Sequence, residues 1–476
     1  PRGIELPIGT AIISIAPTNT GVAGIGLMRP TLPFSRICTM YWLLALLAAF
    51  NVVSMITIYR DRHAERVEPP WTLFAYSLVT TELAWVWLPV QLLVALALVS
   101  LGALSSALGV VALLVLVLSW LGLVNNIRMA LQSTMLTEAA LQSGLGADYR
   151  QDIGEAARHS LEDGATIQDW VRPFHMRRPG VEKLKNIAYG PAGIRQRLDI
   201  YRPAQIPEGG CPVLLQIHGG AWMMGSKDQQ ALPLMYHMAS KGWICVAINY
   251  RLSPSVSFPV HIEDCKRALC WIRTEGHKYG MNPDFVAVTG GSAGGHLTAL
   301  MGLTANLPEF QREFPDIDTG VQAVVPFYGI YDMLARFDTH SRDVFVRFVH
   351  NRIIHQPLAQ NPEIWELASP ITHIHRQAPP FMIIQGEIDS LTNSRGAHIF
   401  HHKLLEVSEN PAVYLELPGA EHAFDNIHSP RTDPVIHGVH RFLEWSLAQH
   451  SKRGDQVASD TGAGHTQSPS AQAISG

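Results

Sequence analysis

Three long uncharged runs near the N-terminus constrain the fold of this chain more than any other feature. The run Met40–Ile58 holds no charged residue, and as a helix rising about 1.5 Å per residue it nearly crosses a hydrocarbon core of about 30 Å. Ala84–Leu101 and Ala107–Val124 are further uncharged runs, and the short Gly- and Ser-containing segment between them predicts a helical hairpin. We therefore predict about three transmembrane helices within residues 37–125, after an N-terminal segment 1–36.

Two alternatives to membrane spans account for these runs less well. Buried helices of a soluble protein are one alternative, but three such runs in succession are rare in globular cores. A cleaved signal peptide would account only for the first run. Arginines flank the runs on both sides in nearly equal number, so the orientation stays open. The chain starts with Pro1, and Met28 is one candidate for the natural start. We expect a multi-pass protein in contact with the lipid bilayer, with the plasma membrane as its location.

Charge and cysteine content exclude several classes of protein. The net charge is -4 and no Lys/Arg run is present, so nothing predicts a nucleic-acid partner. The five cysteines form no CxxC pair, and the histidines form no H-E-x-x-H pattern. The sequence therefore predicts buried free thiols, with no disulfide framework, no metal site and no cofactor.

The pattern changes twice after the apolar runs. Residues 126–190 are polar with some helical spacing, which predicts a linker or cap helices. Residues 191–449 alternate short apolar runs with helical stretches, which indicates an α/β fold with a mostly parallel sheet and helices on both faces. The tail 450–476 lacks apolar residues to bury, so we expect it to be disordered. The predicted strands are 213–217, 244–249, 285–289, 321–327, 381–384 and 413–417, and the main predicted helices are 261–279, 293–304, 394–405 and 434–448.

A candidate nucleophile lies between a predicted strand and a predicted helix. Gly290, Ser292 and Gly294 form a G-x-S-x-G pattern at that point. A tight strand-to-helix turn holds such a serine in a strained conformation with its hydroxyl exposed, and the flanking glycines leave room for it. The pattern alone is weak, because an ordinary glycine-rich turn would look the same.

A second glycine-rich segment follows an earlier strand. His218 is followed by Gly219 and Gly220, whose backbone N–H groups can stabilise the charge on a carbonyl oxygen in a tetrahedral intermediate. We predict Gly219, Gly220 and Ala293 as the oxyanion donors. His218 precedes the nucleophile, and we expect it to brace the loop.

The remaining partners follow the last two predicted strands. Asp389 comes just after the strand 381–384, and His422 comes just after the strand 413–417. The order Ser292, Asp389, His422 is that of α/β-hydrolases. His422 would take the serine proton, and Asp389 would fix its tautomer. Glu387 is a competing carboxylate, predicted to lie on the opposite face of the strand.

At these motifs residues 197–446 resemble the hormone-sensitive-lipase-like carboxylesterases of the α/β-hydrolase superfamily. The HGGAW segment from His218 and the GGSAGG segment from Gly290 carry the resemblance. It implies hydrolysis of short- to medium-chain acyl esters through an acyl-enzyme, with residues 125–190 and 332–366 as a cap. In that insert Phe337, Phe345 and Trp365 would either contact an acyl chain or pack the cap. Gly291 departs from the pattern, since many relatives carry Asp there, while the relatives with Gly include esterase-like and formamidase-like proteins.

The sequence thus predicts a membrane-anchored serine carboxylesterase or lipase acting on small-molecule or lipid esters. Two alternatives stay open: an amidase or formamidase with the same triad, and a non-catalytic membrane protein with a hydrolase-like binding domain. Acyl length, the side of the membrane and the oligomeric state are not determined by the sequence.

Overall fold

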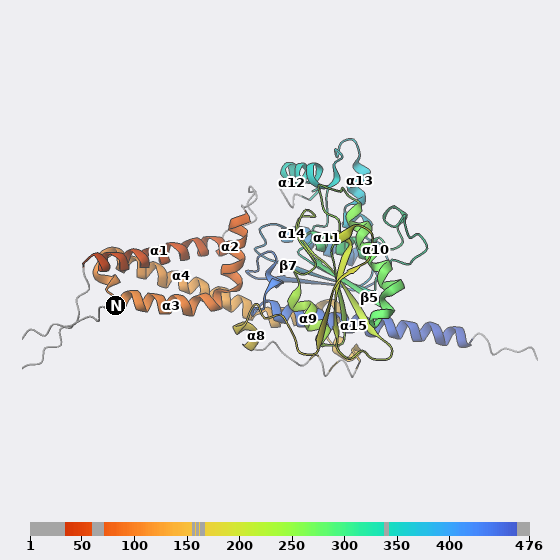
Figure 1. Cartoon of the computed structure of the whole chain (residues 1–476), viewed down its shortest axis with the longest axis horizontal. Coiled ribbons are helices and arrows are strands. Elements are labelled where there is room, and N and C mark those ends of the chain that lie inside the picture. Colours follow the sequence, from red (N-terminus) through yellow and green to blue (C-terminus); the bar gives the residue numbers. More distant parts are fainter. Residues whose placement is uncertain are drawn as a thin grey trace, which may run out of the picture.

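The computed structural model shows a bundle of helices beside an α/β domain (Figure 1). It describes residues 34–59, 71–154, 158, 161, 167–337 and 342–463. The predicted N-terminal segment therefore falls outside the described residues up to position 33, as does the candidate start Met28.

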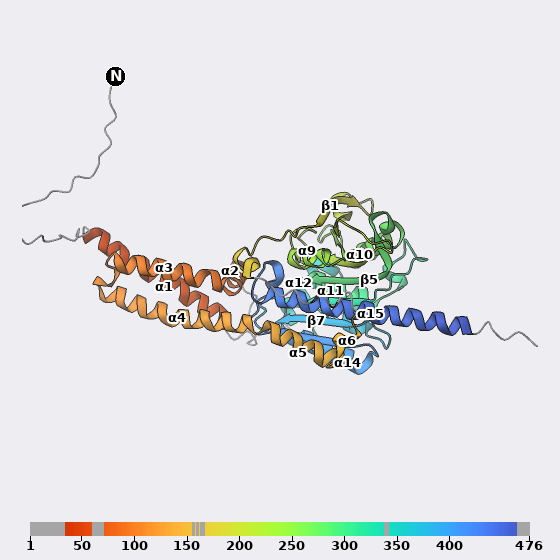
Figure 2. The same ribbon diagram turned by 90° about the horizontal axis from the view of Figure 1, so that it is seen from below.

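The three uncharged runs are helices. Helix α1 is Phe34–Tyr59, α3 is Ala84–Ser100 and α4 is Ala107–Leu131. A turn, η1 (Ala103–Ser105), joins the last two, and the Ser106 hydroxyl caps α4 by accepting a hydrogen bond from the Gly109 amide at 3.1 Å. The predicted helical hairpin is therefore present, and α1, α3 and α4 run side by side (Figure 2).

Two helices among the described residues are long and apolar enough to cross a membrane: Thr39–Tyr59 and Ala107–Leu145. The predicted span at Ala84–Leu101 differs, because α3 has only 17 residues. It passes the same test of length and composition only together with helix α2 (Trp71–Glu82), from which it is bent by 82°. The sequence did not predict α2, which lies across the end of the bundle that faces the α/β domain (Figure 1).

Many large apolar side chains of the bundle point outward. Its interior is small and holds residues such as Leu44, Ala95 and Leu116. Leucines on the outer faces of all three long helices are about two-thirds exposed, among them Leu46 at 65%, Leu93 at 68% and Leu118 at 67%. Surfaces of this extent are unusual in soluble monomers and mark contact with a membrane or another protein.

The α/β domain is built on one sheet of eight strands in the order β1-β2-β4-β3-β5-β6-β7-β8. The strands from β3 to β8 pair in parallel, and β1 and β2 join the edge in antiparallel pairs. The predicted strands correspond to β3–β8, whereas β1 and β2 were missed. Their bounds are β1 Val181–Ala188, β2 Arg197–Pro203, β3 Cys211–Ile217, β4 Ile244–Ile248, β5 Met281–Gly291, β6 Ala323–Phe327, β7 Phe381–Gly386 and β8 Ala412–Leu417.

Helices cover both faces of the sheet, as the alternating strands require. Odd and even strand positions feed two separate apolar clusters. The helices α10, α11 and α14 contribute to one cluster, and α5, α9 and α15 contribute to the other. The helix bounds are α5 Ser133–Leu145, α6 Tyr149–Asp152, α8 Ile167–Val171, α9 Leu232–Ser240, α10 Val260–Glu275, α11 Ala293–Leu303, α12 Arg342–Val349, α13 Pro362–Leu367, α14 Ser394–Val407 and α15 Thr432–Ala463. Short 3₁₀ helices are η2 Gly193–Gln196, η3 Gly276–Tyr279, η4 Pro308–Phe310, η6 Pro370–His373 and η7 Phe424–Asn426, and η5 His350–Ile354 is a short π-helix.

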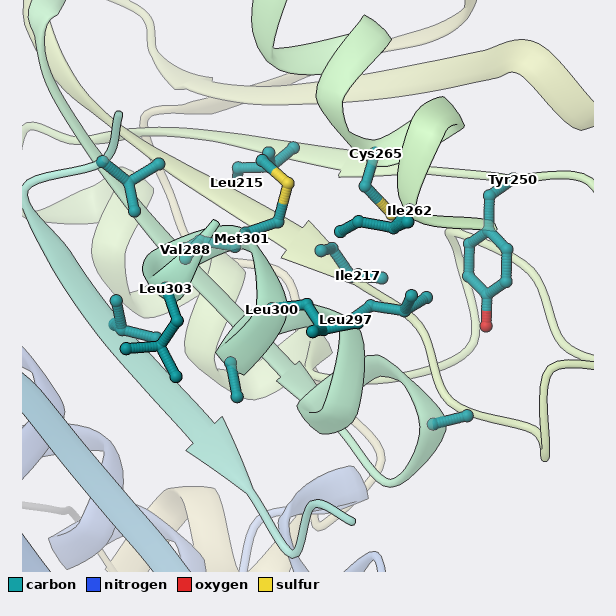
Figure 3. Close-up of a cluster of buried hydrophobic side chains, with 14 of the residues drawn as sticks. Leu215, Ile217, Tyr250, Ile262, Cys265, Val288, Leu297, Leu300, Met301 and Leu303 are labelled. Atoms are coloured by element: carbon teal, nitrogen blue, oxygen red, sulfur yellow. The ribbon is translucent and has the colours of Figure 1, made fainter. Parts of the chain in front are cut away.

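Helix α11 is buried on all sides. Every residue from Ala293 to Leu303 is buried, because the helix is in contact with the sheet, α10 and η6. Figure 3 shows Leu297, Leu300 and Met301 of α11 packed against Ile217 of β3 and Ile262 of α10. The segment after Ser292 is therefore held rigidly.

Two predicted boundaries differ from the structure. Within the predicted linker or cap at 126–190, α5 packs on β8 and α15 and places Leu141 in the domain core, and β1 forms the sheet edge. These two described parts of the range therefore belong to the α/β domain. Residues 450–463, expected to be disordered, continue helix α15, and residues 464–476 lie outside the described part.

The burial of side chains tests two further predictions, one on the aromatic residues of the insert and one on the cysteines. Phe345 and Trp365 of the insert lie in the domain core, so packing accounts for both side chains. The cysteines Cys211, Cys245, Cys265 and Cys270 are free and buried, as predicted.

Candidate active site

The candidate catalytic residues all follow strands at the carboxyl edge of the sheet. Ser292 follows β5, Asp389 follows β7 and His422 follows β8. The candidate oxyanion loop follows β3 at His218. In open α/β sheets ligands bind outside this edge, so the topology gathers these loops where a ligand would bind.

Ser292 lies in a strained turn. Its backbone angles are φ 60° and ψ -123°, a region that side-chain-bearing residues rarely adopt and that clusters at functional sites. A hydrogen bond from the Ser292 amide to the Phe327 carbonyl at 3.0 Å holds the turn. Gly290 and Gly294 are required by the close passage of β3, since a Cβ on them would lie 2.4 and 2.1 Å from the Ile217 carbonyl oxygen.

The three predicted oxyanion donors differ in whether their backbone amides already have a hydrogen-bond acceptor. Gly219 lies against the nucleophile, because a Cβ added to it would be 3.0 Å from Ser292 Cβ. Its amide, however, already donates to Gln230 Oε1 at 2.6 Å. Within the part of the chain that the structure describes, the amides of Gly220 and Ala293 have no such acceptor. Of the three predicted donors, Gly219 is therefore the one whose amide is engaged by another group in this conformation.

The His218 ring contacts the glycine-rich loop that the sequence predicted it to brace. Its ring is fully buried and stacks on Tyr250 with centroids 4.4 Å apart, and its Nδ1 lies 2.7 Å from the Gly219 carbonyl. Burial lowers the pKa of His218 to about 4. The ring is therefore neutral, with Nδ1 donating to that carbonyl.

A second buried histidine, which the sequence did not reveal, supports the same loop. Trp222 Nε1 donates to His296 Nδ1 at 3.2 Å, and His296 Nε2 donates to the Ala368 carbonyl at 2.7 Å. This pattern requires the neutral ring, and burial lowers the pKa of His296 to about 4. His296 thus ties the glycine loop to α11, the helix that begins after Ser292.

Asp389 and His422 are paired. The distance from His422 Nδ1 to Asp389 Oδ2 is 2.8 Å, and both side chains are almost fully buried. Asp389 also accepts from the amides of Leu391 and Thr392 at 2.8 and 2.7 Å, and from Gln385 Nε2 at 3.1 Å. A carboxylate with this many donors keeps a fixed orientation, and so does the imidazole bonded to it.

The neighbouring carboxylates have other partners. Glu387, the competing candidate, accepts from the Gly419 amide at 2.9 Å and so holds the loop that leads to His422. Glu421 accepts from the amides of Ser390 and His422 at 2.7 and 3.0 Å. Both carboxylates therefore stabilise the loops that carry Asp389 and His422.

Tyr328 connects the histidine to the nucleophile turn. Its ring packs on His422 with centroids 4.5 Å apart. A Cβ on Gly291 would lie 2.6 Å from the Tyr328 hydroxyl, so a side chain before Ser292 would collide with this ring in this chain. The hydroxyl donates to Asp425, and burial raises the pKa of that carboxyl.

The bundle also reaches the site. Phe74 of α2 meets His422 edge-to-face, with ring centroids 6.0 Å apart. No pattern in the sequence indicated this contact. Among the described residues, no three His, Cys, Asp or Glu side chains are grouped so that they could hold a metal ion.

Comparison with known proteins places the chain in a family. It is 41% identical over 418 residues to the probable carboxylic ester hydrolase LipM of Mycobacterium tuberculosis, a match that covers 86% of this chain and 95% of the relative. The chain belongs to the same α/β-hydrolase family. Esterase LipQ of that organism is 38% identical over 66% of this chain and 75% of the relative. Because the LipM match covers so much of the chain, it extends beyond the α/β domain into the helical bundle.

Two further comparisons agree on the fold. The BD-FAE family model matches residues 198–404, a range that contains Ser292 and Asp389 and ends before His422. Esterase B from Lactobacillus rhamnosis has a solved structure with a TM-score of 0.51 and 20% identity, covering 67% of this chain and 98% of that chain. At this identity the likeness concerns the fold alone.

Proposed function

We propose that this chain is a membrane-anchored serine esterase that cleaves acyl esters with Ser292, His422 and Asp389. Its family relatives are esterases, and the chain is accordingly a carboxylic-ester hydrolase. The single observation that carries the mechanism is the buried 2.8 Å bond between His422 Nδ1 and Asp389 Oδ2, at the sheet edge where Ser292 also follows its strand in a strained turn.

In the proposed reaction the Ser292 hydroxyl oxygen forms a bond to the ester carbonyl carbon while His422 Nε2 takes its proton. The oxygen of the tetrahedral intermediate accepts from the amides of Gly220 and Ala293. Gly219 would join them only after its bond to Gln230 opens. The carbon–oxygen bond to the alcohol then breaks, and the alcohol leaves with the proton from His422. Water then attacks the acyl-enzyme, again giving its proton to His422, and the acid leaves as Ser292 regains a proton.

A fluorophosphonate probe and a set of substrates test this proposal. The probe should label the wild-type chain and the Ser226→Ala variant, and it should fail to label Ser292→Ala. Ser226 is a suitable control because it is a partly exposed serine of the same glycine-rich loop region. Labelling of Ser292→Ala would contradict the assignment. A wild-type chain that takes no label would favour the non-catalytic binding domain.

Substrate comparison separates the remaining alternative. An esterase should cleave p-nitrophenyl acyl esters much faster than the matching anilides or N-formyl amides. The reverse preference would identify an amidase or formamidase that uses the same residues.

The proposed membrane anchor rests on two helices of sufficient length and on the exposed leucines of the bundle. The full chain should remain with membranes after extraction in alkaline carbonate and should dissolve in detergent. Release by carbonate would show that the bundle is bound in another way.

A further inference from the structure

Helix α2 is the part of the bundle that approaches the candidate catalytic histidine. Phe74 is partly buried, and its ring meets His422 at an interplanar angle of 71°. The ring lies, half-buried, next to the imidazole that takes the serine proton in the proposed reaction. Phe74 therefore has the position of a side chain that lines a binding site.

A buried ion pair fixes α2 in this position. Glu82, at the end of α2, pairs with Arg431 of the loop before α15, and the two side chains are 0% and 1% exposed. The Ser429 hydroxyl donates to Glu82 Oε2 at 2.9 Å. Arg431 Nη2 also donates to the Pro418 carbonyl at 3.2 Å, four residues before His422. The end of α2 and the histidine loop thus form one bonded cluster.

The bundle orients α2 relative to its apolar surface. Asn126 of α4 donates to the Thr81 carbonyl at 2.8 Å, so α2 is also held by the helix that is long enough to cross a membrane. Figure 1 shows α2 lying across the end of the bundle, between the long helices and the α/β domain. Helix α2 therefore lies where the bundle meets the domain, with Phe74 next to His422.

We propose that α2 forms one wall of the substrate site, with Phe74 as a specificity-determining residue, and that the substrate is an ester whose acyl chain comes from the lipid bilayer. This inference rests on the proposed esterase function and adds the substrate class to it. Phe74 contacts the acyl chain in this arrangement, while Ser292 attacks the ester carbonyl and His422 takes the serine proton.

The test compares chain-length selectivity in Phe74→Ala and in a control on the same helix. Val79→Ala is the matched control, because Val79 is 42% exposed on α2. The quantity is the ratio of kcat/KM for a p-nitrophenyl decanoate to kcat/KM for the acetate, in detergent-solubilised full chain. Loss of apolar contact in a binding site changes such ratios by about tenfold, so the ratio should fall about tenfold in Phe74→Ala and keep its wild-type value in Val79→Ala. Phe74→Leu should restore most of the selectivity.

A second measurement uses the chain in vesicles that contain diacylglycerol. Wild type and Val79→Ala should release fatty acid, and Phe74→Ala should release it about tenfold more slowly. An unchanged selectivity ratio in Phe74→Ala, or an equal fall in Val79→Ala, overturns the inference. Failure of the underlying function looks different, because a wild-type chain without Ser292-dependent hydrolysis of either p-nitrophenyl ester would remove both proposals.

Discussion

Breaking the ion pair between Glu82 and Arg431 should strongly destabilise the protein. Both side chains are at most 1% exposed, so Glu82→Gln leaves a guanidinium buried without its counter-charge. Removing one partner of such a pair costs about 3–5 kcal/mol. With a shift of about 2–4 °C per kcal/mol for a domain of this size, the unfolding temperature of the α/β domain should fall by about 10 °C.

A double-mutant cycle makes the reasoning refutable. Arg431→Met alone should be as harmful as Glu82→Gln, since it leaves the carboxylate buried, whereas the double variant should be more stable than either single one. Tryptophan fluorescence of the full chain in detergent follows the transition. The control is Lys452→Met, which removes an exposed pair with Asp152 and should cost less than about 1 kcal/mol. The argument would be refuted if the losses in free energy of unfolding of the two buried substitutions simply added in the double variant. It would also be refuted if Glu82→Gln lost no more free energy of unfolding than the control.

Three other substitutions or conditions test the site. Gly294→Ala would place a Cβ 2.1 Å from the Ile217 carbonyl oxygen. The variant should therefore lose about 1–3 kcal/mol of unfolding free energy in thermal unfolding and react more slowly with the fluorophosphonate. Unchanged labelling would contradict the close packing at Gly294. Asp389→Asn should lower kcat by about 10⁴, and a loss below tenfold would show that His422 does not depend on this carboxylate. His218 and His296 have pKa values lowered from 6.5 to about 4, so the unfolded chain binds the extra protons first. The contribution of the two neutral rings to the free energy of unfolding is complete above pH 6.5 and is lost as the pH falls from 6.5 toward 4. At pH 5 the free energy of unfolding should be lower by about 2 kcal/mol for each ring. A melting temperature at pH 5.0 equal to that at pH 7.5 would contradict this sign.

The parallel part of the sheet was predictable from the sequence because its strands are buried on both faces. Strands such as Ile244–Ile248 and Ala323–Phe327 consist of buried residues throughout, and such runs are apolar from end to end. The edge strand Val181–Ala188 was missed for the opposite reason. It is half exposed, carries Glu182, Lys183 and Lys185, and resembles a polar linker until its pairing with β2 is known.

The candidate site was predictable where a motif is local. The turn at Ser292 needs close glycines on either side, and that requirement is visible within five residues. The engagement of the Gly219 amide by Gln230 is not visible, since it depends on how the loop between them folds back. The contact between Phe74 and His422 is harder still, because the two residues come from different parts of the fold and share no spacing rule.

Two separate contacts join the bundle to the loop that carries His422. Helix α5 continues the line of α4 along the domain (Figure 2) and packs on β8, the strand that leads to His422. At the other end of that loop, Arg431 bonds to Glu82 and to the Pro418 carbonyl. A tether that served only for attachment would need neither contact. Because both contacts converge on the loop that carries His422, disturbing the bundle should alter kcat as well as the proposed membrane attachment.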